Sequence, residues 1–427
     1  MELEERSRQR REEIDSILER KPGVREVQDD EDRFTVVGAA SRETYANWLT
    51  PIEEHFVCHR NPIPEAGESW SVSLSGDLDG ELSMTELRDL PTVAVAHTME
   101  CAGNGRGQHD PQTGDVQWGY EAAATAVWTG TPVSSVLRAR GLDSDDEKRW
   151  LTAIGGDPAV DGDIYVRSIS LSKALSDCIL AYGMNGQPLP EEHGAPVRLL
   201  VPGWYGANSV KWVSELRVMD GMVTEGSLDR PETHARWQQE AYRFYPAGDT
   251  PEPNKSIDEF DTWEQLRSER IEHPYAFDQN VMSVIGSPTG EEPIDSGKTE
   301  IHGVAWAGDD AIERVEISTD VRKSFALSSQ SEARGASDDG GETWEEAELF
   351  GPEYSCAWRL FRYMWDAPEG IHTLVSRATD EHGRVQPARI SDPKEFAEAL
   401  ENGEYPWNGG GYGANAYLPN AVEVEVK

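Results

Sequence analysis

Cysteine is scarce in this 427-residue chain, and long apolar runs are missing. The four cysteines, Cys58, Cys101, Cys178 and Cys356, lie far apart and form no CxxC pair. A disulfide scaffold and a zinc ribbon both need closely spaced cysteines, so the sequence argues against either and indicates a reduced compartment. The N-terminus has no hydrophobic signal region, and no stretch reaches the roughly 18 apolar residues of a membrane-spanning helix. We therefore expect a cytoplasmic protein that is neither exported nor bound to a membrane.

Basic residues are also few, because 39 Lys and Arg face 79 Asp and Glu and leave a formal net charge of −40 at pH 7. So negative a chain repels nucleic acid and anionic membranes, which excludes both as partners. Intrinsic disorder, another source of acidic composition, is excluded by 37% hydrophobic residues and 14 Trp. Acidic residues spread along a folded chain are typical of proteins that stay soluble in concentrated salt, so we expect a halophilic protein.

The chain divides into segments of different patterning. Residues 1–40 predict a charged extension with a solvated helix, to which we assign no chemistry. Residues 41–250 alternate short apolar runs with Gly, Pro and Asn loops and predict a mixed α/β domain. Residues 251–275 predict a linker, and the alternating strands and glycine turns of residues 276–427 predict an all-β, Ig-like sandwich. The expected fold class is therefore α+β, in two domains.

The segment CAGNGRG, residues 101–107, follows the predicted strand TVAVAHTME. Its glycines do not meet the GxGxxG pattern, no helix pattern follows, and there is no Walker lysine, so a nucleotide-binding loop is not supported. A thiol at a strand end followed by small residues lets backbone wrap closely around a bulky group, and a soft metal would fit there. A buried structural cysteine is the alternative for Cys101.

Several motifs at long separation occur in a fixed order along the chain. They are CAGNGR, HGAPVRLLVPGWYGANSVKW, RWQQEAYRFYP, the turn DDGGETW and the ending VQP…WNGGGYGANAY. Together they resemble the sulfite oxidase family of molybdenum enzymes, and the resemblance covers roughly residues 45–427. It implies a molybdenum–molybdopterin cofactor in the first domain and a homodimer formed through the Ig-like domain.

The resemblance also implies which residues hold the cofactor. Cys101 matches the single cysteine thiolate on molybdenum, whose other positions are filled by the pterin dithiolene and by oxo or water ligands. A terminal phosphate needs basic donors, and Lys211 is one of the few lysines in the chain. An ordinary surface lysine is the alternative, which the apolar neighbours of Lys211 weaken. The residues that match those holding the phosphate and the polar edge of the pterin are His193, Arg198, Ser209 and Lys211.

The catalytic pocket is implied in the same way. Tyr242 matches the family's active-site tyrosine, which hydrogen-bonds near the oxo ligands, and an ordinary core tyrosine is the alternative. Arg106 and Trp118 match residues that line the pocket. We therefore expect Tyr242, Arg106 and Trp118 to form the catalytic group.

Two positions depart from the family pattern. In FVCHRNPIP, residues 56–64, Cys58 stands where an anion-binding arginine is expected, and an arginine occurs at Arg60 instead. Gly410 stands where a second substrate arginine would fall. Each lost charge-assisted hydrogen bond is worth about 1.5 to 3 kcal/mol, so the loss of both predicts weak binding of sulfite.

The same segment carries the cluster His55, Cys58 and His59. Side-chain alternation on an extended segment would send Cys58 and His59 to opposite faces, which argues against a zinc site. We expect His59 and Arg60 to contribute to cofactor binding.

The sequence thus predicts a molybdopterin-dependent oxidoreductase that exchanges an oxygen atom with sulfite or a related small sulfur compound in a two-electron step. Two alternatives stay open: nitrate or sulfoxide reduction on the same fold, and a cofactor-binding protein without turnover. Joint retention of Cys101, Arg106 and Tyr242 disfavours the second alternative. No haem or cytochrome module is recognised beside the core, so we expect an external electron acceptor.

The net charge makes the stability of the fold depend on salt. Forty uncompensated negative charges repel one another in the compact state, and salt screens this repulsion as the Debye length falls to about 3 Å at 1 M. We expect the melting temperature to rise between about 0.1 and 3 M potassium chloride. A melting temperature that stays flat over this range in a calorimeter would contradict the halophilic interpretation.

Overall fold

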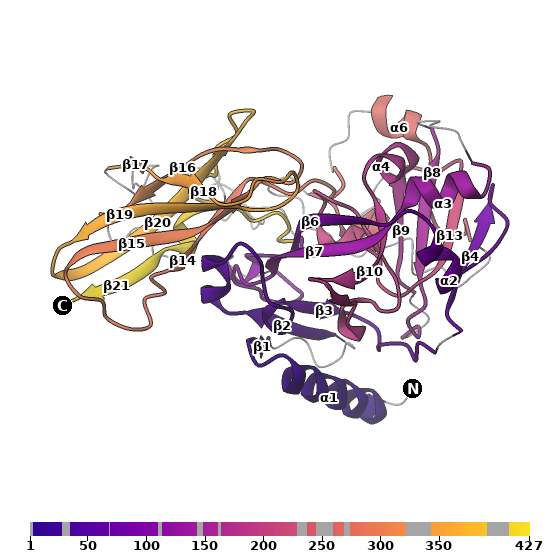
Figure 1. Cartoon of the computed structure of the whole chain (residues 1–427), viewed down its shortest axis with the longest axis horizontal. Coiled ribbons are helices and arrows are strands. Elements are labelled where there is room, and N and C mark those ends of the chain that lie inside the picture. The colour runs from indigo at the N-terminus through magenta and orange to yellow at the C-terminus, as the bar shows by residue number, and fades with distance from the viewer. Residues whose placement is uncertain are drawn as a thin grey trace, which may run out of the picture.

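A computed structural model of the chain describes residues 3–27, 35–67, 69–109, 113–142, 148–160, 164–228, 237–244, 259–268, 274–321, 343–390 and 410–427. Figure 1 shows two lobes side by side, a larger one from the first part of the chain and a smaller one from the C-terminal strands. This is the expected order of a mixed α/β domain and an all-β domain. Among the described residues, no helix is both long and apolar enough to cross a lipid bilayer.

Three β-sheets build the described part of the larger lobe. A small antiparallel sheet contains β1 (Val24–Glu26), β2 (Val36–Ala40) and β3 (Val57–His59). A five-stranded sheet has the order β5 (Gly80–Ser83), β4 (Ser71–Gly76), β13 (Val213–Met219), β8 (Trp150–Gly155) and β9 (Val166–Ser170). The other contains β11 (Gln187–Pro188), β10 (Ile179–Met184), β7 (Ala123–Pro132), β6 (Val93–Glu100) and β12 (Arg198–Leu200).

Short helices connect these strands, and their ends follow local sequence signals. Before α2, the Ser83 hydroxyl accepts a hydrogen bond from the Glu86 N–H (3.2 Å), and the Glu86 carboxylate accepts one from the Ser83 N–H (2.9 Å), which forms a capping box. The α-helices after α1 are α2 (Met84–Asp89), α3 (Val133–Ala139), α4 (Leu171–Ser176) and α6 (Trp263–Ser268). Single helical turns are η1 (Arg42–Ala46), η2 (Ile52–Glu54), η3 (Arg106–Gln108), η4 (Glu191–His193), η5 (Gly206–Asn208), η6 (Trp237–Ala241) and η7 (Leu418–Asn420).

The N-terminal helix α1 (Leu3–Arg20) confirms the helix predicted there, but its solvation was predicted wrongly. Ile14 and Ile17 are each 2% exposed and pack against Val36 and Val57 of the small sheet. Their spacing of three residues places both on one face of the helix, which gives the extension an apolar stripe despite its high charge. The segment is therefore docked on the larger lobe.

The C-terminal lobe is a sandwich of two four-stranded sheets, as expected. One sheet has the order β14 (Met282–Ser287), β15 (Gly297–Trp306), β19 (Arg359–Ala367) and β18 (Glu348–Phe350). The other has the order β17 (Glu345–Glu346), β16 (Ile312–Ser318), β20 (Gly370–Asp380) and β21 (Val422–Val426). The inward-facing apolar side chains of both sheets form one core cluster.

The predicted linker, residues 251–275, is described at residues 259–268 and 274–275, and the rest of it lies outside the described residues. Its described part is less exposed than a linker would be, because Phe260, Leu266 and Tyr275 pack against Trp150 and Met222 of the larger lobe. Leu266 belongs to α6, the helical part of the segment, whereas Phe260 and Tyr275 lie before and after that helix.

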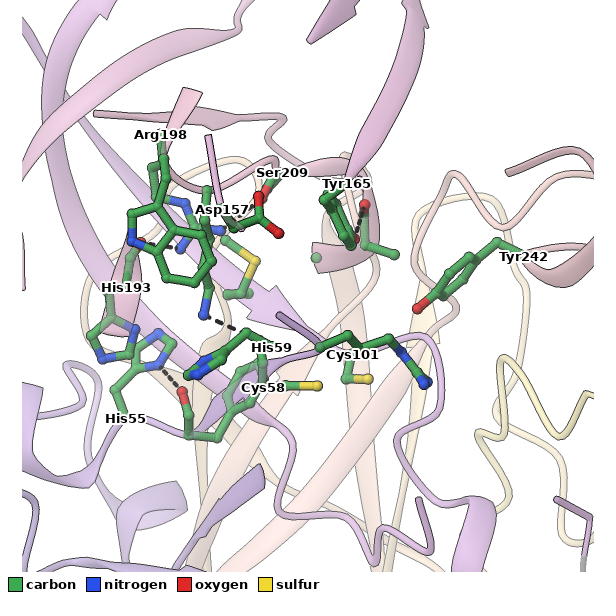
Figure 2. Close-up of a pocket in the computed structure, with 17 residues that line it drawn as sticks. His55, Cys58, His59, Cys101, Asp157, Tyr165, His193, Arg198, Ser209 and Tyr242 are labelled. Atoms are coloured by element: carbon green, nitrogen blue, oxygen red, sulfur yellow. Dashed lines mark hydrogen bonds between the residues drawn. The ribbon is translucent and has the colours of Figure 1, made fainter. Parts of the chain in front are cut away.

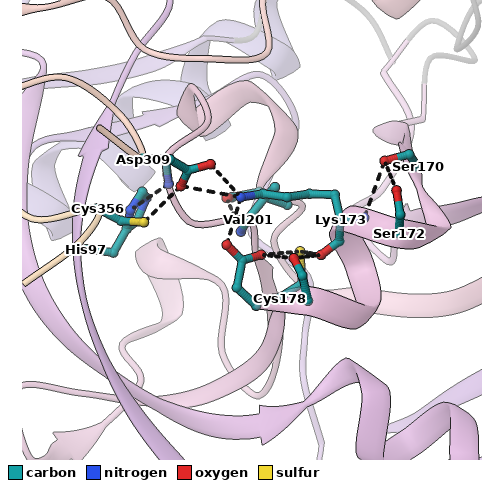
Figure 3. A network of polar contacts seen from close by, with 12 residues as sticks. His97, Ser170, Ser172, Lys173, Cys178, Val201, Asp309 and Cys356 are labelled. Atoms are coloured by element: carbon teal, nitrogen blue, oxygen red, sulfur yellow. Dashed lines mark hydrogen bonds and ion pairs between the residues drawn. The ribbon is translucent and has the colours of Figure 1, made fainter. Parts of the chain in front are cut away.

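A polar network joins the two lobes (Figure 3). The Lys173 ammonium on α4 lies 2.7 Å from the Asp177 carboxylate and 3.1 Å from that of Asp309 in the sandwich. The Cys356 thiol donates to Asp309 at 3.0 Å, and the Cys356 carbonyl accepts from the Thr98 N–H of β6 at 2.7 Å. The sandwich is thereby attached to the strand that leads to Cys101.

A second contact ties the interface directly to the segment around Cys101. The Glu100 carboxylate accepts hydrogen bonds from Trp306 Nε1 of the sandwich (2.9 Å) and from Asn104 Nδ2 (3.1 Å). Burial raises the pKa of Glu100 to about 8, and these two donors oppose the rise. Glu100 thus couples the orientation of the sandwich to the start of the CAGNGRG loop.

Candidate active site

A cavity in the larger lobe collects residues from segments far apart in the sequence (Figure 2). It lies where the end of β6 meets β3 and the loops around β12. The lining residues are His55, Phe56, Cys58, His59, Arg60, Met99, Cys101, Asp157, Tyr165, His193, Arg198, Gly206, Ala207, Ser209, Lys211, Trp212 and Tyr242.

Cys101 is the first residue after β6, and a tight glycine loop holds it there. The Gly105 N–H donates to the Gly119 carbonyl (2.7 Å), and the Gly107 N–H donates to the Trp118 carbonyl (2.6 Å). Gly105 has φ +82°, and a Cβ on Gly107 would lie 2.8 Å from the Trp118 carbonyl oxygen. These positions require glycine, because any side chain would be strained or would clash with the opposing backbone. The loop can therefore bring the Cys101 thiol to the cavity wall.

The Cys101 thiol has electrostatic surroundings that favour its ionised form. A hydrogen bond from Cys58 lowers the pKa of Cys101 despite its burial, and the Arg106 charge and the Gly103 N–H act in the same direction. The same contact and burial raise the pKa of Cys58. A thiolate is the form of cysteine that binds metal, so Cys101 is prepared as a ligand.

Basic side chains enclose the opposite end of the cavity. Arg198 donates to the carbonyls of His193 (2.9 Å) and Ser209 (3.0 Å), and Lys211 donates to the carbonyl of Glu192 (2.6 Å). Burial lowers the pKa of Arg198 to about 10 and that of Lys211 to about 7, and the Arg198 charge adds to the effect on Lys211. Enclosed cations whose pKa falls in this way would be stabilised by a bound anion such as a phosphate.

The N-terminal segment supplies further groups at this end. The buried Lys21 ammonium lies 3.0 Å from His193 Nε2, and Glu13 on α1 lies 2.5 Å from His59 Nε2. Burial lowers the pKa of Lys21 to about 8, and Glu192 opposes this. Residues 1–40, to which we assigned no chemistry, thus contact the imidazoles of His59 and His193 at the cavity. The expectation that this segment has no part in the site is therefore corrected.

Several polar atoms of the lining residues lack a hydrogen-bond partner within the described part of the chain. They are buried, although a buried polar atom without a partner costs free energy in a folded protein. Such atoms are accounted for when a polar ligand fills the cavity and bonds to them. The atoms are His55 Nε2, His59 Nδ1, Arg60 Nη1, Asp157 Oδ1 and Arg198 Nε.

The end of the cavity nearest Tyr242 combines aromatic rings with arginines. Arg60 pairs with Asp115 at 2.5 Å and lies 5.0 Å above the Trp237 ring. Arg167, which sequence reasoning missed, lies 4.9 Å from the centre of the Tyr242 ring and 4.2 Å from that of Tyr165. Burial raises the pKa of Tyr242, and the charges of Arg60 and Arg167 oppose the rise.

Most of the predicted cofactor and catalytic residues meet in this one cavity: His59, Arg60, Cys101, His193, Arg198, Ser209, Lys211 and Tyr242. Cys58 and His59 are neighbours on β3 and both line the cavity. Figure 2 shows their side chains extending in different directions from the strand, which agrees with the alternation expected there.

Arg106 and Trp118 are corrections, because neither belongs to the lining residues. The Arg106 guanidinium donates to the carbonyls of Val116 (3.0 Å) and Gly410 (3.1 Å) and lies 4.9 Å above the Tyr412 ring. Trp118 is 1% exposed and packs edge-on behind Phe56 with ring centres 6.1 Å apart. Both support the cavity wall from the layer behind it.

Sequence reasoning also missed Asp157 and Tyr165 as cavity residues, and only weak signals could have found them. Asp157 follows two glycines at the end of β8, and Tyr165 directly precedes β9. Strand ends are common places for functional side chains, but nothing in the sequence states which strand ends meet.

Comparison with known proteins identifies the family of the chain. Residues 60–225 match the oxidoreductase molybdopterin binding domain, and residues 273–402 match the Mo-co oxidoreductase dimerisation domain. Sulfite oxidase of Gallus gallus is 31% identical over 365 residues, which covers 81% of this chain and 69% of that protein. The chain therefore belongs to the sulfite oxidase family of molybdopterin-dependent oxidoreductases, and its cofactor is molybdenum–molybdopterin.

Other relatives define how far the similarity extends. Mitochondrial sulfite oxidase of Homo sapiens is 30% identical over 372 residues, covering 83% of this chain and 60% of that protein, so this chain spans about 60% of its length. Nitrate reductase [NADH] 2 of Phaseolus vulgaris is 29% identical over 385 residues, covering 84% of this chain and 39% of that protein. The sulfane dehydrogenase SoxCD from Paracoccus pantotrophus shares the fold, with a TM-score of 0.65 at 24% identity over 92% of this chain and 87% of that one.

The basic end of the cavity generates a test of cofactor binding. Lys211→Gln removes one enclosed charge and should weaken the affinity for the phosphate-bearing pterin by about 10- to 100-fold. It should not lower the melting temperature of the cofactor-free protein, because an enclosed charge without an anion is itself unfavourable. Pterin content and calorimetry on the same samples measure both effects. Exposed Lys148→Gln is the control, and wild-type affinity in Lys211→Gln would contradict the assignment.

Proposed function

We propose that this protein oxidises a small oxyanion of sulfur, sulfite above all, by two-electron oxygen-atom transfer. The observation that carries the proposal is the position of the Cys101 thiol in one cavity with enclosed cations at one end and the Tyr242 and Arg60 side chains at the other. The bound molybdenum supplies the oxygen-atom exchange. The residues of the chain bind, orient and hold protons around it.

The cofactor roles follow from the donors present. Cys101 would hold the molybdenum through its sulfur. The polar edge and phosphate of the pterin would bond to the unpartnered ring nitrogen of His59 and to the guanidinium of Arg198. A hydrophobic ligand would leave these buried polar groups without hydrogen bonds. His193, Ser209 and Lys211 lie beside them on the same wall and complete the cradle.

The substrate roles rest on Arg60 and Tyr242. Nη1 of Arg60 is buried without a partner in the described part of the chain, so it is free to donate to an anion. Tyr242 keeps its hydroxyl proton at neutral pH, because burial raises its pKa. It can therefore hold and donate a proton beside the substrate. Arg167 adds positive charge behind the Tyr242 ring.

The shift of an arginine from position 58 to position 60 changes the substrate site without removing its charge. Arg60 reaches the same cavity that Cys58 lines, but part of its charge is neutralised by Asp115. Gly410 contributes only its carbonyl, which accepts from Arg106. We therefore expect sulfite to bind, but weakly.

The dimerisation-domain match of residues 273–402 supports a homodimer formed through the C-terminal sandwich, which we propose with an external electron acceptor. We also propose a halophilic, cytoplasmic protein, supported by its net charge of −40 and its few cysteines.

Nitrate reduction is the second candidate, because the similarity to nitrate reductase [NADH] 2 covers 84% of this chain. Nitrate is also a small oxyanion that Arg60 could bind. A cofactor-binding protein without turnover is less well supported, since such a protein would not need a protonated tyrosine and an unpartnered arginine donor at the cofactor.

Steady-state kinetics on the purified, molybdenum-loaded protein test the proposal. With ferricyanide as acceptor, sulfite should be oxidised with a Michaelis constant far above the micromolar range. Arg60→Gln should raise that constant about tenfold or more with a smaller effect on kcat, because one charge-assisted hydrogen bond to the anion is lost. Asp115→Asn, which frees Arg60 from its ion pair, should lower the constant or leave it unchanged.

Arg8→Gln, on the exposed face of α1, is the matched control and should change neither constant. Nitrate reduction by the loaded protein without any sulfite oxidation would establish the second candidate instead. An unchanged Michaelis constant in Arg60→Gln would remove Arg60 from the substrate site.

A further inference from the structure

A carboxylate of helix α1 contacts a ring that lines the cavity. The Glu13 side chain is 14% exposed, and its Oε1 lies 2.5 Å from Nε2 of His59. Its other oxygen, Oε2, accepts a hydrogen bond from the Ile63 N–H at 3.2 Å. Glu13 lies far before residue 60, where the match to the molybdopterin binding domain begins. The contact therefore comes from a part of the chain that this match does not cover.

The contact with Glu13 determines which nitrogen of His59 carries the proton. A carboxylate only accepts hydrogen bonds, so Nε2 carries the proton and donates it to the hydrogen bond with Glu13. Burial lowers the pKa of His59 although Glu13 opposes this, so the ring is neutral at pH 7. Nδ1 is therefore left with a lone pair and can act only as an acceptor.

The Nδ1 acceptor of His59 has no hydrogen-bond partner within the described part of the chain, and it is buried. An acceptor buried without a donor costs free energy in a folded protein. The ring lines the cavity, so a ligand there can supply the donor. An N–H group on the edge of a pterin is a donor of this kind.

His55 supplies a second acceptor by an independent contact. Its Nδ1 lies 3.0 Å from the Phe56 carbonyl oxygen, which only accepts, so Nδ1 carries the proton. Burial lowers the pKa of His55, so its Nε2 is also an acceptor, and it is buried without a partner among the described residues. Both rings line the cavity (Figure 2). Two imidazole acceptors in one cavity favour a ligand that offers several N–H donors.

We propose that Glu13 is a positioning residue for the cofactor, which holds the proton of His59 on Nε2 so that Nδ1 accepts a hydrogen bond from an N–H of the pterin. The inference rests on the proposed contact between His59 and the pterin. The carboxylate is itself held in place by the Ile63 N–H and by the packing of Ile14 and Ile17 on the small sheet. Helix α1 thereby forms part of the cofactor site.

Glu13→Gln tests this assignment while the shape of the side chain is kept. An amide has one acceptor oxygen, whereas Glu13 accepts from both His59 and the Ile63 N–H. Because a backbone N–H can only donate, the amide oxygen should face Ile63 and the amide NH2 should donate to His59 Nε2. The proton of His59 should then move to Nδ1, where it opposes the N–H of the pterin.

Two measurements on the molybdenum-loaded protein follow the proton and the cofactor. NMR of the imidazole nitrogens, assigned with His59→Phe, should show the His59 proton on Nε2 in the wild type and on Nδ1 in Glu13→Gln. The rate of pterin release, measured by the fluorescence of oxidised pterin after ultrafiltration, should rise about tenfold in Glu13→Gln because one hydrogen bond is lost. A merely structural role of Glu13 would leave the proton on Nε2.

Glu12→Gln is the matched control, because Glu12 lies on the same helix and its side chain is 73% exposed. It should change neither the NMR signals of His59 nor the release rate. A His59 proton on Nδ1 or on both nitrogens in the wild type would overturn the inference, and so would a proton that stays on Nε2 in Glu13→Gln.

His59→Phe separates this inference from the proposed function. Faster pterin release in His59→Phe together with an unchanged rate in Glu13→Gln would overturn the inference alone. Release at the wild-type rate in both variants would remove His59 from the cofactor site and would overturn the inference with it.

Discussion

Enclosure of positive charge at one end of the cavity is the constraint on which the site depends. Arg198 is 3% exposed, and Lys211 has a pKa lowered by its burial and by Arg198. A chain with a net charge of −40 has many carboxylates that could pair with cations. Arg198 and Lys211 nevertheless donate mainly to backbone carbonyls. An anionic group bound between them offsets their desolvation, so the fold of this region is adapted to a phosphate-bearing ligand.

The other end of the cavity combines two thiols with one arginine. Cys58 places a neutral thiol against Cys101, and Arg60 brings its charge from two residues further along the same segment. Because Asp115 neutralises part of that charge, the site retains a positive field weaker than two free arginines would give. Cys101, the enclosed cations and Arg60 thus line one cavity, and Glu100 connects the start of its glycine loop to the sandwich.

Sequence reasoning located cavity residues that lie close together in the sequence. His193, Arg198, Ser209 and Lys211 fall within one short stretch that folds as η4, β12 and η5, so one motif identified them all. Cys101 was identified because it stands at a strand end before small residues and matches the metal-binding cysteine of the family. The change in hydrophobic periodicity along the chain also predicted an α+β domain followed by a β-sandwich.

Long-range contacts could not be predicted in this way. Lys21 meets His193 across 172 residues, and Glu13 meets His59 across 46, so no spacing rule reveals either pair. Arg106 and Trp118 were expected in the cavity because they match residues that line the pocket in the family, whereas packing puts them one layer behind. The apolar residues of α1 have helical spacing in the sequence, but the many charged residues around them led to the prediction of a solvated helix.

Metal analysis combined with X-ray absorption tests the central claim most directly. Protein purified from molybdenum-sufficient cells should contain molybdenum and pterin in equimolar amounts with the chain, and the metal should have a protein sulfur neighbour that is lost in Cys101→Ser while the pterin stays bound. A wild-type protein that binds the pterin but holds molybdenum without a sulfur from Cys101, or holds none, would contradict the account.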